Sequence, residues 1–467
     1  MIAKFVKMKR PFVACAVLFV AAAVTSCSGG GGGGASAPVV VPVTTTAPTA
    51  MPTASPTPVS APTVAPAAVP VQLTVQGGFY AQIVAHIPQA RQMAALPNGD
   101  LLVGTLANTV YIVPGAENAG GAQAPVVFAT VPDTKAHSVA YSPDAGAIFI
   151  AATNHVYKVP YKSGDRVASA VPSSVLSVRT GNIAPNSDGD VHTTTSLAVS
   201  KTTLYVSVGS SCNSCAEVDP TRAAILSTDF NGGSVVHVAT RVRNAIALGV
   251  NPASQHLWIG GAGQDCLPQG TTTCGSQNDA YFNGRPFDWV DDLSARATPV
   301  VDYMWPLCEE NRRDQHSFNA VWPTSDCSSA PIPVIEFPTY STHIGLTIYP
   351  QSQTGAYAFP AAYRGLYVTS HGSWHESASG VAIAQPDLAY VRMNGDTPAT
   401  SVNFTNPGAQ WNSFFGNFQD TFGSRVGQPT GVTVGASGSL FVADDNAGVV
   451  YRLRPGLAPA SVNRRSR

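Results

Sequence analysis

Charged residues are scarce in this sequence. Asp, Glu, Lys and Arg make up 11% of the chain, and 26 basic residues almost balance 27 acidic ones, giving a formal net charge of −1 at pH 7. Four of the basic residues, Lys4, Lys7, Lys9 and Arg10, lie in the first ten positions, and the charge without them would be −5 (−1 minus 4). No basic cluster of the kind that binds DNA or RNA phosphates remains. The composition therefore excludes a nucleic-acid partner.

Four other features are missing. No apolar run after the N-terminal segment is long enough to span a bilayer. The sequence contains neither the H-E-x-x-H motif of zinc enzymes nor the C-x-x-C-H motif that attaches haem. Stretches with the apolar spacing of an amphipathic helix are also absent. These absences argue against a membrane-spanning protein, a zinc enzyme and a haem domain, and they favour an all-β fold.

The N-terminus is typical of an exported protein. A basic start is followed by the apolar run "PFVACAVLFVAAAV" and then by "VTSC", which ends at Cys27. This segment resembles a bacterial lipoprotein signal, and the resemblance implies a signal peptide over residues 1–26, cleavage before Cys27 and a lipid on that cysteine. Ser28 follows, which favours the periplasmic side or the surface of the outer membrane. The alternative is an ordinary secretory signal.

Residues 27–72 are rich in Gly, Pro, Thr and Ala and almost lack charge. Such a segment cannot bury a core, so we expect a flexible or extended tether. The globular part is then expected over residues 73–457, with a disordered C-terminal tail over residues 458–467.

Six cysteines lie in the globular part. An even number in an exported protein indicates disulfides, although six cysteines allow fifteen connectivities. The local spacings suggest the pairs Cys212–Cys215, Cys266–Cys274 and Cys308–Cys327. For "CNSC", a thioredoxin-like role would need a βαβ setting, and a structural zinc would need two further ligands. We expect this disulfide to hold its loop rigid, with Asp219 and Arg222 paired within the loop.

One phrase recurs along the chain. Each copy is a turn, an alternating apolar strand and then small residues; the copies are "NGDLLVGT", "AGAIFIAA", "KTTLYVSV", "SQHLWIGG", "YRGLYVTS" and "SGSLFVAD". Repeats of about fifty residues made of strands bounded by Gly, Pro, Asn and Asp predict a β-propeller. Six copies predict six blades of four antiparallel strands. A degenerate seventh blade between Leu257 and Leu366, or a sandwich of ordinary hairpins, are the alternatives.

Several segments carry a family resemblance. "GSSCNSCAEVDPTRAAIL", "RVRNAIALGVNP", "HLWIGGAGQD" and "YRGLYVTSHGSWHESASG" resemble the sorbosone dehydrogenase-like proteins, relatives of the soluble glucose and aldose sugar dehydrogenases. This resemblance implies a propeller that holds pyrroloquinoline quinone (PQQ) and Ca²⁺ and oxidises a small sugar or aldehyde. Electrons would then pass to a separate periplasmic acceptor.

The resemblance also assigns roles to individual residues. His192 matches the catalytic base, and Arg243 with Asn244 matches an Arg-Asn pair over the quinone. Ser211 and His371 match positions that contact the cofactor. A base must take the proton of a sugar hydroxyl as hydride leaves, and histidine titrates near neutral pH. A guanidinium stabilises the negative charge that a quinone gains.

The segment "GGAGQD" matches the calcium-binding turn. Gly263 and Gln264 would bind Ca²⁺ through their carbonyl oxygens, and Asp265 would lie beside the cofactor. Calcium prefers oxygen ligands, including main-chain carbonyls, and glycines let such carbonyls converge. "YMWP" at Tyr303 corresponds to a YGWP motif of the family.

Some positions depart from the family pattern. A cysteine-bracketed loop follows Asp265 where an acidic run is usual, Tyr340 replaces a common histidine with His343 shifted along, and His375 replaces a common asparagine. Two other functions therefore stay open. One is a calcium-binding, lactonase-like propeller hydrolase, and the other is a catalytically inactive cell-surface binding propeller.

Overall fold

The computed structural model describes residues 62–187, 189–265, 287–309, 311–317, 322–373, 384–406 and 408–457. The expected signal peptide, Cys27, most of the tether, the Cys266–Cys274 pair, His375 and the C-terminal tail lie outside these residues. Helical structure in the described ranges is limited to three short 3₁₀ turns, η1 (Leu293–Ala295), η2 (Gln315–Ser317) and η3 (Ala361–Tyr363). No helix in the described part is long and apolar enough to cross a membrane.

Six sheets of four or five strands form the blades, which we number in the chain order of their first strands. Blades 1 to 3 contain β5 (Ala90–Ala95), β6 (Leu101–Thr105), β7 (Thr109–Val113) and β9 (Val126–Thr130); β10 (Ser138–Ser142), β11 (Ala147–Ala151), β12 (His155–Pro160) and β13 (Ser173–Ser177); and β14 (Thr195–Val199), β15 (Leu204–Val208), β16 (Ala224–Thr228), β17 (Val236–Thr240) and β21 (Val301–Asp302).

Blades 4 to 6 follow the same order from first to last strand. They contain β18 (Ala245–Val250), β19 (Leu257–Gly261), β20 (Asp288–Asp292) and β22 (Ile335–Phe337); β23 (His343–Ile348), β24 (Leu366–Ser370), β25 (Asp387–Val391), β28 (Trp411–Gly416) and β3 (Thr74–Val75); and β29 (Pro429–Val434), β30 (Leu440–Asp444), β31 (Val449–Pro455), β4 (Phe79–His86) and β2 (Ala67–Ala68).

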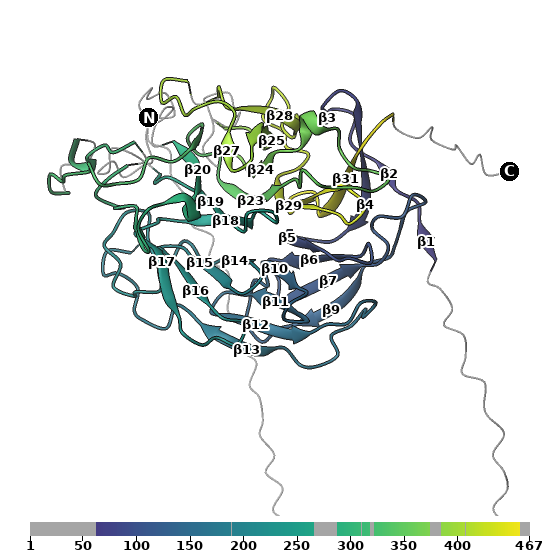
Figure 1. Cartoon of the computed structure of the whole chain (residues 1–467), viewed down its shortest axis with the longest axis horizontal. Helices are drawn as coiled ribbons and strands as arrows, with labels where there is room; N and C mark the ends of the chain where they lie inside the picture. Colours follow the sequence, from purple (N-terminus) through teal and green to yellow (C-terminus); the bar gives the residue numbers. More distant parts are fainter. Residues whose placement is uncertain are drawn as a thin grey trace, which may run out of the picture. The chain divides into compact units, whose positions relative to one another are not determined.

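The first strands of the blades surround a common centre. β5, β10, β14, β18, β23 and β29 contact one another in that order, and β29 contacts β5 again, which closes the ring (Figure 1). The predicted six-bladed β-propeller is therefore confirmed. Blade 6 joins the two ends of the propeller, because the early strand β4 pairs with β31 in a register that places Tyr451 opposite Ile83.

Two short strands lie within the segment assigned to the tether. β2 pairs with β4 at the edge of blade 6, and β1 (Thr63–Val64) pairs with β8 (Ala122–Gln123) in a separate two-stranded sheet. Edge pairing uses backbone N–H and C=O groups, which a stretch of small residues provides without an apolar pattern. Three blades also exceed the expected four strands, and the added β21 lies parallel to β17.

The repeated phrase marks the same strand in every blade. Its six copies are the second strands β6, β11, β15, β19, β24 and β30. These strands are buried almost throughout, and every residue of β6 and β11 is buried, because each blade packs on a neighbour at both faces. Six apolar clusters fill the spaces between successive blades, and together they form the core. The gap proposed for a seventh blade contains β20 and β22 of blade 4 and β21 of blade 3.

This topology brings two kinds of loop together. First and second strands pair antiparallel, so the residue that begins one strand lies opposite the residue that ends the other, as Thr195 lies opposite Val208 in blade 3. Residues before a first strand and after a second strand therefore share one end of the propeller. His192 and Arg243 are of the first kind, and the loops that begin at Gly209 and Ala262 are of the second.

Candidate functional site

A cavity of about 540 Å³ opens at this end of the propeller, over blades 3 and 4. Its walls include five of the residues selected from the sequence, namely His192, Arg243, Asn244, Gly263 and Asp265. Contributions also come from Lys135, Asn213, Asp288, Tyr340 and Thr342. The volume lies within the range of small-molecule and cofactor sites. The topology thus unites residues that are far apart in the sequence.

Gly209 allows the close approach of His192 and Asn244. A Cβ atom at Gly209 would come within 2.5 Å of Asn244 Oδ1 and 2.6 Å of His192 Cβ. Any larger residue would therefore push these two side chains apart. The glycine that ends "LYVSVG" is needed for the shape of the site.

His192 presents a defined tautomer to the cavity. Its Nδ1 lies 2.9 Å from the Ser210 carbonyl oxygen and 2.9 Å from Ser210 Oγ. Ser210 Oγ donates its own hydrogen to the Cys212 carbonyl at 2.7 Å, so both neighbours of Nδ1 act as acceptors. Nδ1 must therefore carry the hydrogen, which leaves the lone pair on Nε2.

The surroundings also keep His192 neutral. Burial, and next the positive charge of Arg243, lower the pKa of His192 to about 3. The side chain keeps some exposure only because it lines the cavity. A neutral imidazole with a free Nε2 has the form required of a proton acceptor.

Arg243 is held by main-chain and side-chain acceptors. Its Nε donates to the Asn213 carbonyl at 2.9 Å, and its Nη2 donates to Asn213 Oδ1 at 2.8 Å. The Asp265 carboxylate lies farther away, at 3.4 Å from Nη2. Arg243 is buried, yet most of its partners are neutral, so its positive charge is only partly offset. Lys135 is a second cation on the cavity wall.

The turn that begins at Ala262 has main-chain oxygens without hydrogen-bond donors in the described part of the chain. Within the described residues, no donor bonds to the carbonyl oxygens of Gly263 and Gln264. Gln264 is 1% exposed, and neither its Oε1 nor its Nε2 has a partner in the described part. Unbonded carbonyls beside an orphaned buried amide are expected where a cation or a water is bound. Gly263 borders both this cavity and a smaller one of about 40 Å³, whereas Gln264 borders only the smaller one.

Asp288 supports this turn and was missed from the sequence. Its Oδ1 accepts the Gly263 N–H at 2.8 Å, and its Oδ2 accepts the Thr342 N–H at 2.6 Å. Burial raises the pKa of Asp288 to about 7. A signal was present, because "DWVDD" places three carboxylates in one strand of a protein poor in charge, and all of that strand is buried.

Two predicted cofactor contacts lie outside the cavity wall. Ser211 is fully buried and donates to the Glu217 carboxylate at 3.0 Å, while its Oγ accepts the Ala184 N–H at 3.2 Å. His371 Nε2 lies 3.0 Å from Asp445 Oδ1, and Asp445 in turn binds Arg91. In this structure their polar atoms bond to other groups of the protein, and their contact with a cofactor stays a prediction.

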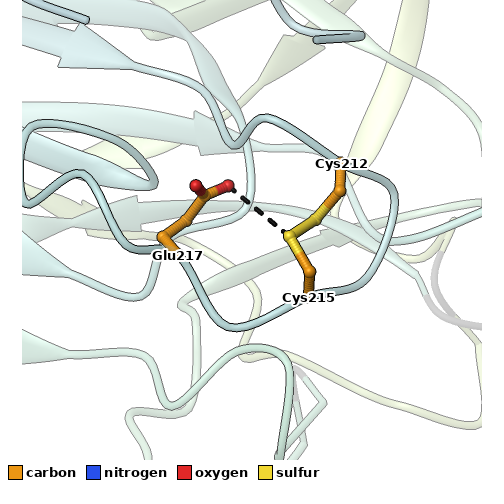
Figure 2. A group of neighbouring side chains, drawn as sticks. All are labelled: Cys212, Cys215 and Glu217. Atoms are coloured by element: carbon orange, nitrogen blue, oxygen red, sulfur yellow. Dashed lines mark hydrogen bonds between the residues drawn. A yellow bond between two sulfur atoms is a disulfide. The ribbon is translucent and has the colours of Figure 1, made fainter. Parts of the chain in front are cut away.

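The "CNSC" loop contains the predicted disulfide between Cys212 and Cys215, and Cys308–Cys327 is also joined as predicted. Figure 2 shows the Glu217 carboxylate beside the first disulfide, 3.8 Å from Cys215 Sγ. Because the joined sulfurs carry no hydrogen and no thiolate charge, this group has no thiolate to ligate a metal.

The predicted Asp219–Arg222 ion pair is wrong. Arg222 instead makes a two-bond ion pair with Asp190, at 2.7 and 2.8 Å. Asp219 accepts the backbone N–H groups of Thr221 and Gly181. The long side chain of Arg222 reaches a carboxylate that is distant in sequence, whereas the Asp219 carboxylate accepts hydrogen bonds within its own turn.

Tyr340 and His343, the two positions that depart from the family pattern in this segment, lie in different surroundings. Tyr340 lines the cavity, whereas His343 is 1% exposed and packs against the ring of Phe337. Burial lowers the pKa of His343 to about 3. The "YMWP" segment lies next to the turn that begins at Ala262, since Tyr303 and Trp305 border the smaller cavity together with that turn.

Solved structures share this fold. The holo PQQ domain of pyranose dehydrogenase from Coprinopsis cinerea aligns with a TM-score of 0.64 at 16% identity, covering 85% of this chain and 98% of that one. The calcium structure of a Trichoderma reesei carbohydrate-active enzyme of family AA12 gives 0.60 at 18% identity, covering 86% and 100%.

A third structure is the PQQ-bound aldose sugar dehydrogenase from Streptomyces coelicolor, with a TM-score of 0.51 at 16% identity over 82% and 99% of the two chains. No family model and no curated protein matches the sequence. The chain therefore has the propeller fold of the solved PQQ-dependent sugar dehydrogenases.

Proposed function

We propose that this protein is a PQQ- and Ca²⁺-dependent dehydrogenase that oxidises an aldose or a sugar aldehyde at the anomeric carbon. One observation carries the proposal. A neutral His192 imidazole with a free Nε2 and the Arg243 cation line the same cavity of about 540 Å³. The fold shared with sugar dehydrogenase structures, one described as PQQ-bound, supports the same assignment.

The residues present fit such a cofactor. PQQ is a flat tricarboxylate, and the cavity wall offers the cations Arg243 and Lys135. The carbonyl oxygens of Gly263 and Gln264 would hold Ca²⁺, which prefers oxygen ligands. When bound, PQQ supplies the acceptor for the hydride, and Ca²⁺ polarises the quinone oxygens.

The chain itself supplies a base and a fixed charge. His192 Nε2 accepts the proton of the anomeric hydroxyl while hydride leaves the same carbon, so the sugar loses two electrons and two protons in total and becomes a lactone. Ser210 keeps the ring in the required tautomer. Arg243 stabilises negative charge where it develops, and Asn213 keeps the guanidinium oriented.

Reconstitution tests this function. Purified protein would be loaded with PQQ and Ca²⁺, and reduction of an artificial dye would be followed with several aldoses. We expect dye reduction that requires both additions and that is lost in His192→Ala. Hydrolysis of lactones without dye reduction would instead indicate a lactonase-like propeller, and PQQ binding without either activity would indicate a binding protein.

We also propose that a lipid on Cys27 attaches the enzyme to the membrane, with electrons passing to a separate periplasmic acceptor. The support is the N-terminal sequence pattern. Expression of the full chain in a bacterium, with labelled palmitate, tests it. We expect label in the wild type and none in Cys27→Ala, which should leave the membrane fraction. Equal membrane attachment of the two proteins would contradict the proposal.

A further inference from the structure

Asn213, at the tip of the Cys212–Cys215 loop, contacts both halves of the proposed site. Toward Arg243 it offers two acceptors, its own carbonyl oxygen at 2.9 Å from Nε and its Oδ1 at 2.8 Å from Nη2. Toward Asp265 it makes a reciprocal pair, since Oδ1 accepts the Asp265 N–H at 2.8 Å and Nδ2 donates to the Asp265 carbonyl at 2.8 Å. One residue thus joins the guanidinium to the end of the calcium-type turn.

The chemistry of this position favours an amide. A neutral Asn can accept from Arg243 and from the Asp265 N–H while donating to the Asp265 carbonyl. An aspartate would lose the donor and would offset the positive charge of the guanidinium. An alanine would keep only the main-chain acceptor for Nε. Asn213 therefore orients Arg243 without neutralising it.

The disulfide fixes the loop that carries Asn213. Cys212 and Cys215 are buried, at 1% and 0% exposure, and they are three residues apart in sequence. A loop this short contributes little chain entropy to stability, so its main effect lies in the geometry of the residues between the cysteines. The loop is held further by Ser210 Oγ, which donates to the Cys212 carbonyl, and by the Ser210 N–H, which donates to the Arg243 carbonyl at 2.8 Å.

We infer that Asn213 is a positioning residue, which sets the Arg243 guanidinium and the turn from Ala262 to Asp265 in one fixed geometry, and that the Cys212–Cys215 disulfide holds Asn213 in place for this purpose. The catalytic meaning of this inference depends on the proposed function, whereas the geometric coupling does not. Small displacements of positioned groups can reduce turnover by on the order of 100-fold.

A double-mutant cycle tests the coupling in the PQQ- and Ca²⁺-loaded protein. Asn213→Ala should lower kcat by roughly 10- to 100-fold with a change in sugar KM below about threefold. Because Asn213 acts in part through Arg243, the loss of kcat in the Asn213→Ala Arg243→Ala double variant should be smaller than the product of the two single losses. Multiplicative losses in the double variant would overturn the inference.

Asn251→Ala is the matched control. Asn251 is also buried, and it also bonds through both amide atoms, to Asp396 at 2.6 Å and to the Ala253 N–H at 3.0 Å, but it follows β18 at the opposite end of that strand from Arg243. We expect this variant to lower Tm about as much as Asn213→Ala while kcat is retained. An equal loss of kcat in Asn251→Ala would show that Asn213 acts only through general stability.

A second measurement is independent of activity. Crystal structures of the cofactor-free Asn213→Ala and Asn251→Ala variants should show Arg243 and the turn displaced only in the first. An unchanged Arg243 and turn in Asn213→Ala would overturn the inference, even if the protein never binds PQQ. Failure of the wild type to bind PQQ, with the displacement present, would instead refute the proposed function alone.

Discussion

The Nδ1 atom of His192 lies 2.9 Å from the carbonyl oxygen of Ser210, which fixes the hydrogen on Nδ1 and leaves Nε2 free. If Nε2 is the base, His192→Ala should lower kcat in the loaded enzyme by about 100- to 10,000-fold. PQQ should still bind, because Arg243 and Lys135 supply the cations. The measurement is dye reduction beside a fluorescence titration with PQQ. A variant that keeps a tenth or more of the wild-type kcat would remove His192 from the base role.

The protonation of His192 should respond to the cofactor. In the free protein, burial and Arg243 lower the pKa of His192 to about 3. An anionic cofactor beside Arg243 would offset part of that cation and so raise this pKa. Histidine NMR spectra of the protein with and without PQQ should show a neutral His192 at pH 5 in the free form and a higher pKa in the complex. Titration of free His192 near pH 6.5 would contradict this electrostatic account.

Asp288 offers a test of the calcium-type turn. Asp288→Asn replaces one acceptor oxygen by an NH₂ group, which cannot accept the Gly263 or Thr342 N–H. Loss of such outer support usually weakens metal binding by about 10- to 100-fold, and we expect a loss of this size in Ca²⁺ affinity. Calcium titration of PQQ-loaded protein measures it.

Asp444→Asn is the control for this experiment. Asp444 is also a fully buried carboxylate that accepts two backbone N–H groups, from Gln428 and Ala447, but it belongs to blade 6. Its substitution should leave Ca²⁺ affinity within about twofold of the wild type. Equal losses in the two variants would mean that Asp288 has no special link to the turn.

The Cys308–Cys327 disulfide should contribute more to stability, whereas the Cys212–Cys215 disulfide should contribute more to activity. Cys308–Cys327 closes 19 residues and Cys212–Cys215 closes 3, so the chain-entropy model gives the longer loop roughly 1.6 kcal/mol more stabilisation. Replacing both cysteines of the longer loop by Ser should therefore lower the free energy of unfolding more. Replacing those of the shorter loop should lower kcat more. Denaturant titrations and dye assays on both double variants check this, and the same ranking in both assays would contradict it.

Buried groups predict opposite pH slopes of stability. The pKa of His343 is lowered to about 3, so below pH 6.5 the unfolded state binds the proton first and acidification destabilises the fold. Burial raises the pKa of Asp444 to about 6, so the folded state binds the proton first and acidification stabilises it. Each effect can reach about 1.4 kcal/mol per pH unit.

Variants separate these two contributions. Between pH 7 and pH 4, His343→Gln should lose stability less steeply than the wild type, and Asp444→Asn should lose it more steeply. Urea unfolding at several pH values measures the slopes. Parallel slopes in all three proteins would show that neither group changes its pKa on folding.

The repeated strands made the fold predictable, because each copy such as "LLVGT" or "AIFIA" is an apolar strand bounded by turn residues. The short strands β1 and β2 could not be predicted, because pairing through main-chain groups requires no apolar pattern in the sequence. Resemblance located His192 and Arg243, and the antiparallel topology explains their meeting in space.

The remaining site residues depend on contacts that local sequence does not record. Ser211 is adjacent to Ser210 in sequence but donates its hydroxyl hydrogen to Glu217. Arg222 pairs with Asp190 and not with Asp219, which is nearer in sequence. The role of Asn213 arises from Arg243 and Asp265, which are 30 and 52 residues away. Such partners become visible only once the blades are assembled.

A crystal structure of the protein reconstituted with PQQ and Ca²⁺ tests the central claim most directly. The account predicts the quinone in the cavity between His192 and Arg243, with the metal on the carbonyl oxygens of the turn at Gly263. Density for PQQ at any other place, or an empty cavity at saturating PQQ, would contradict it.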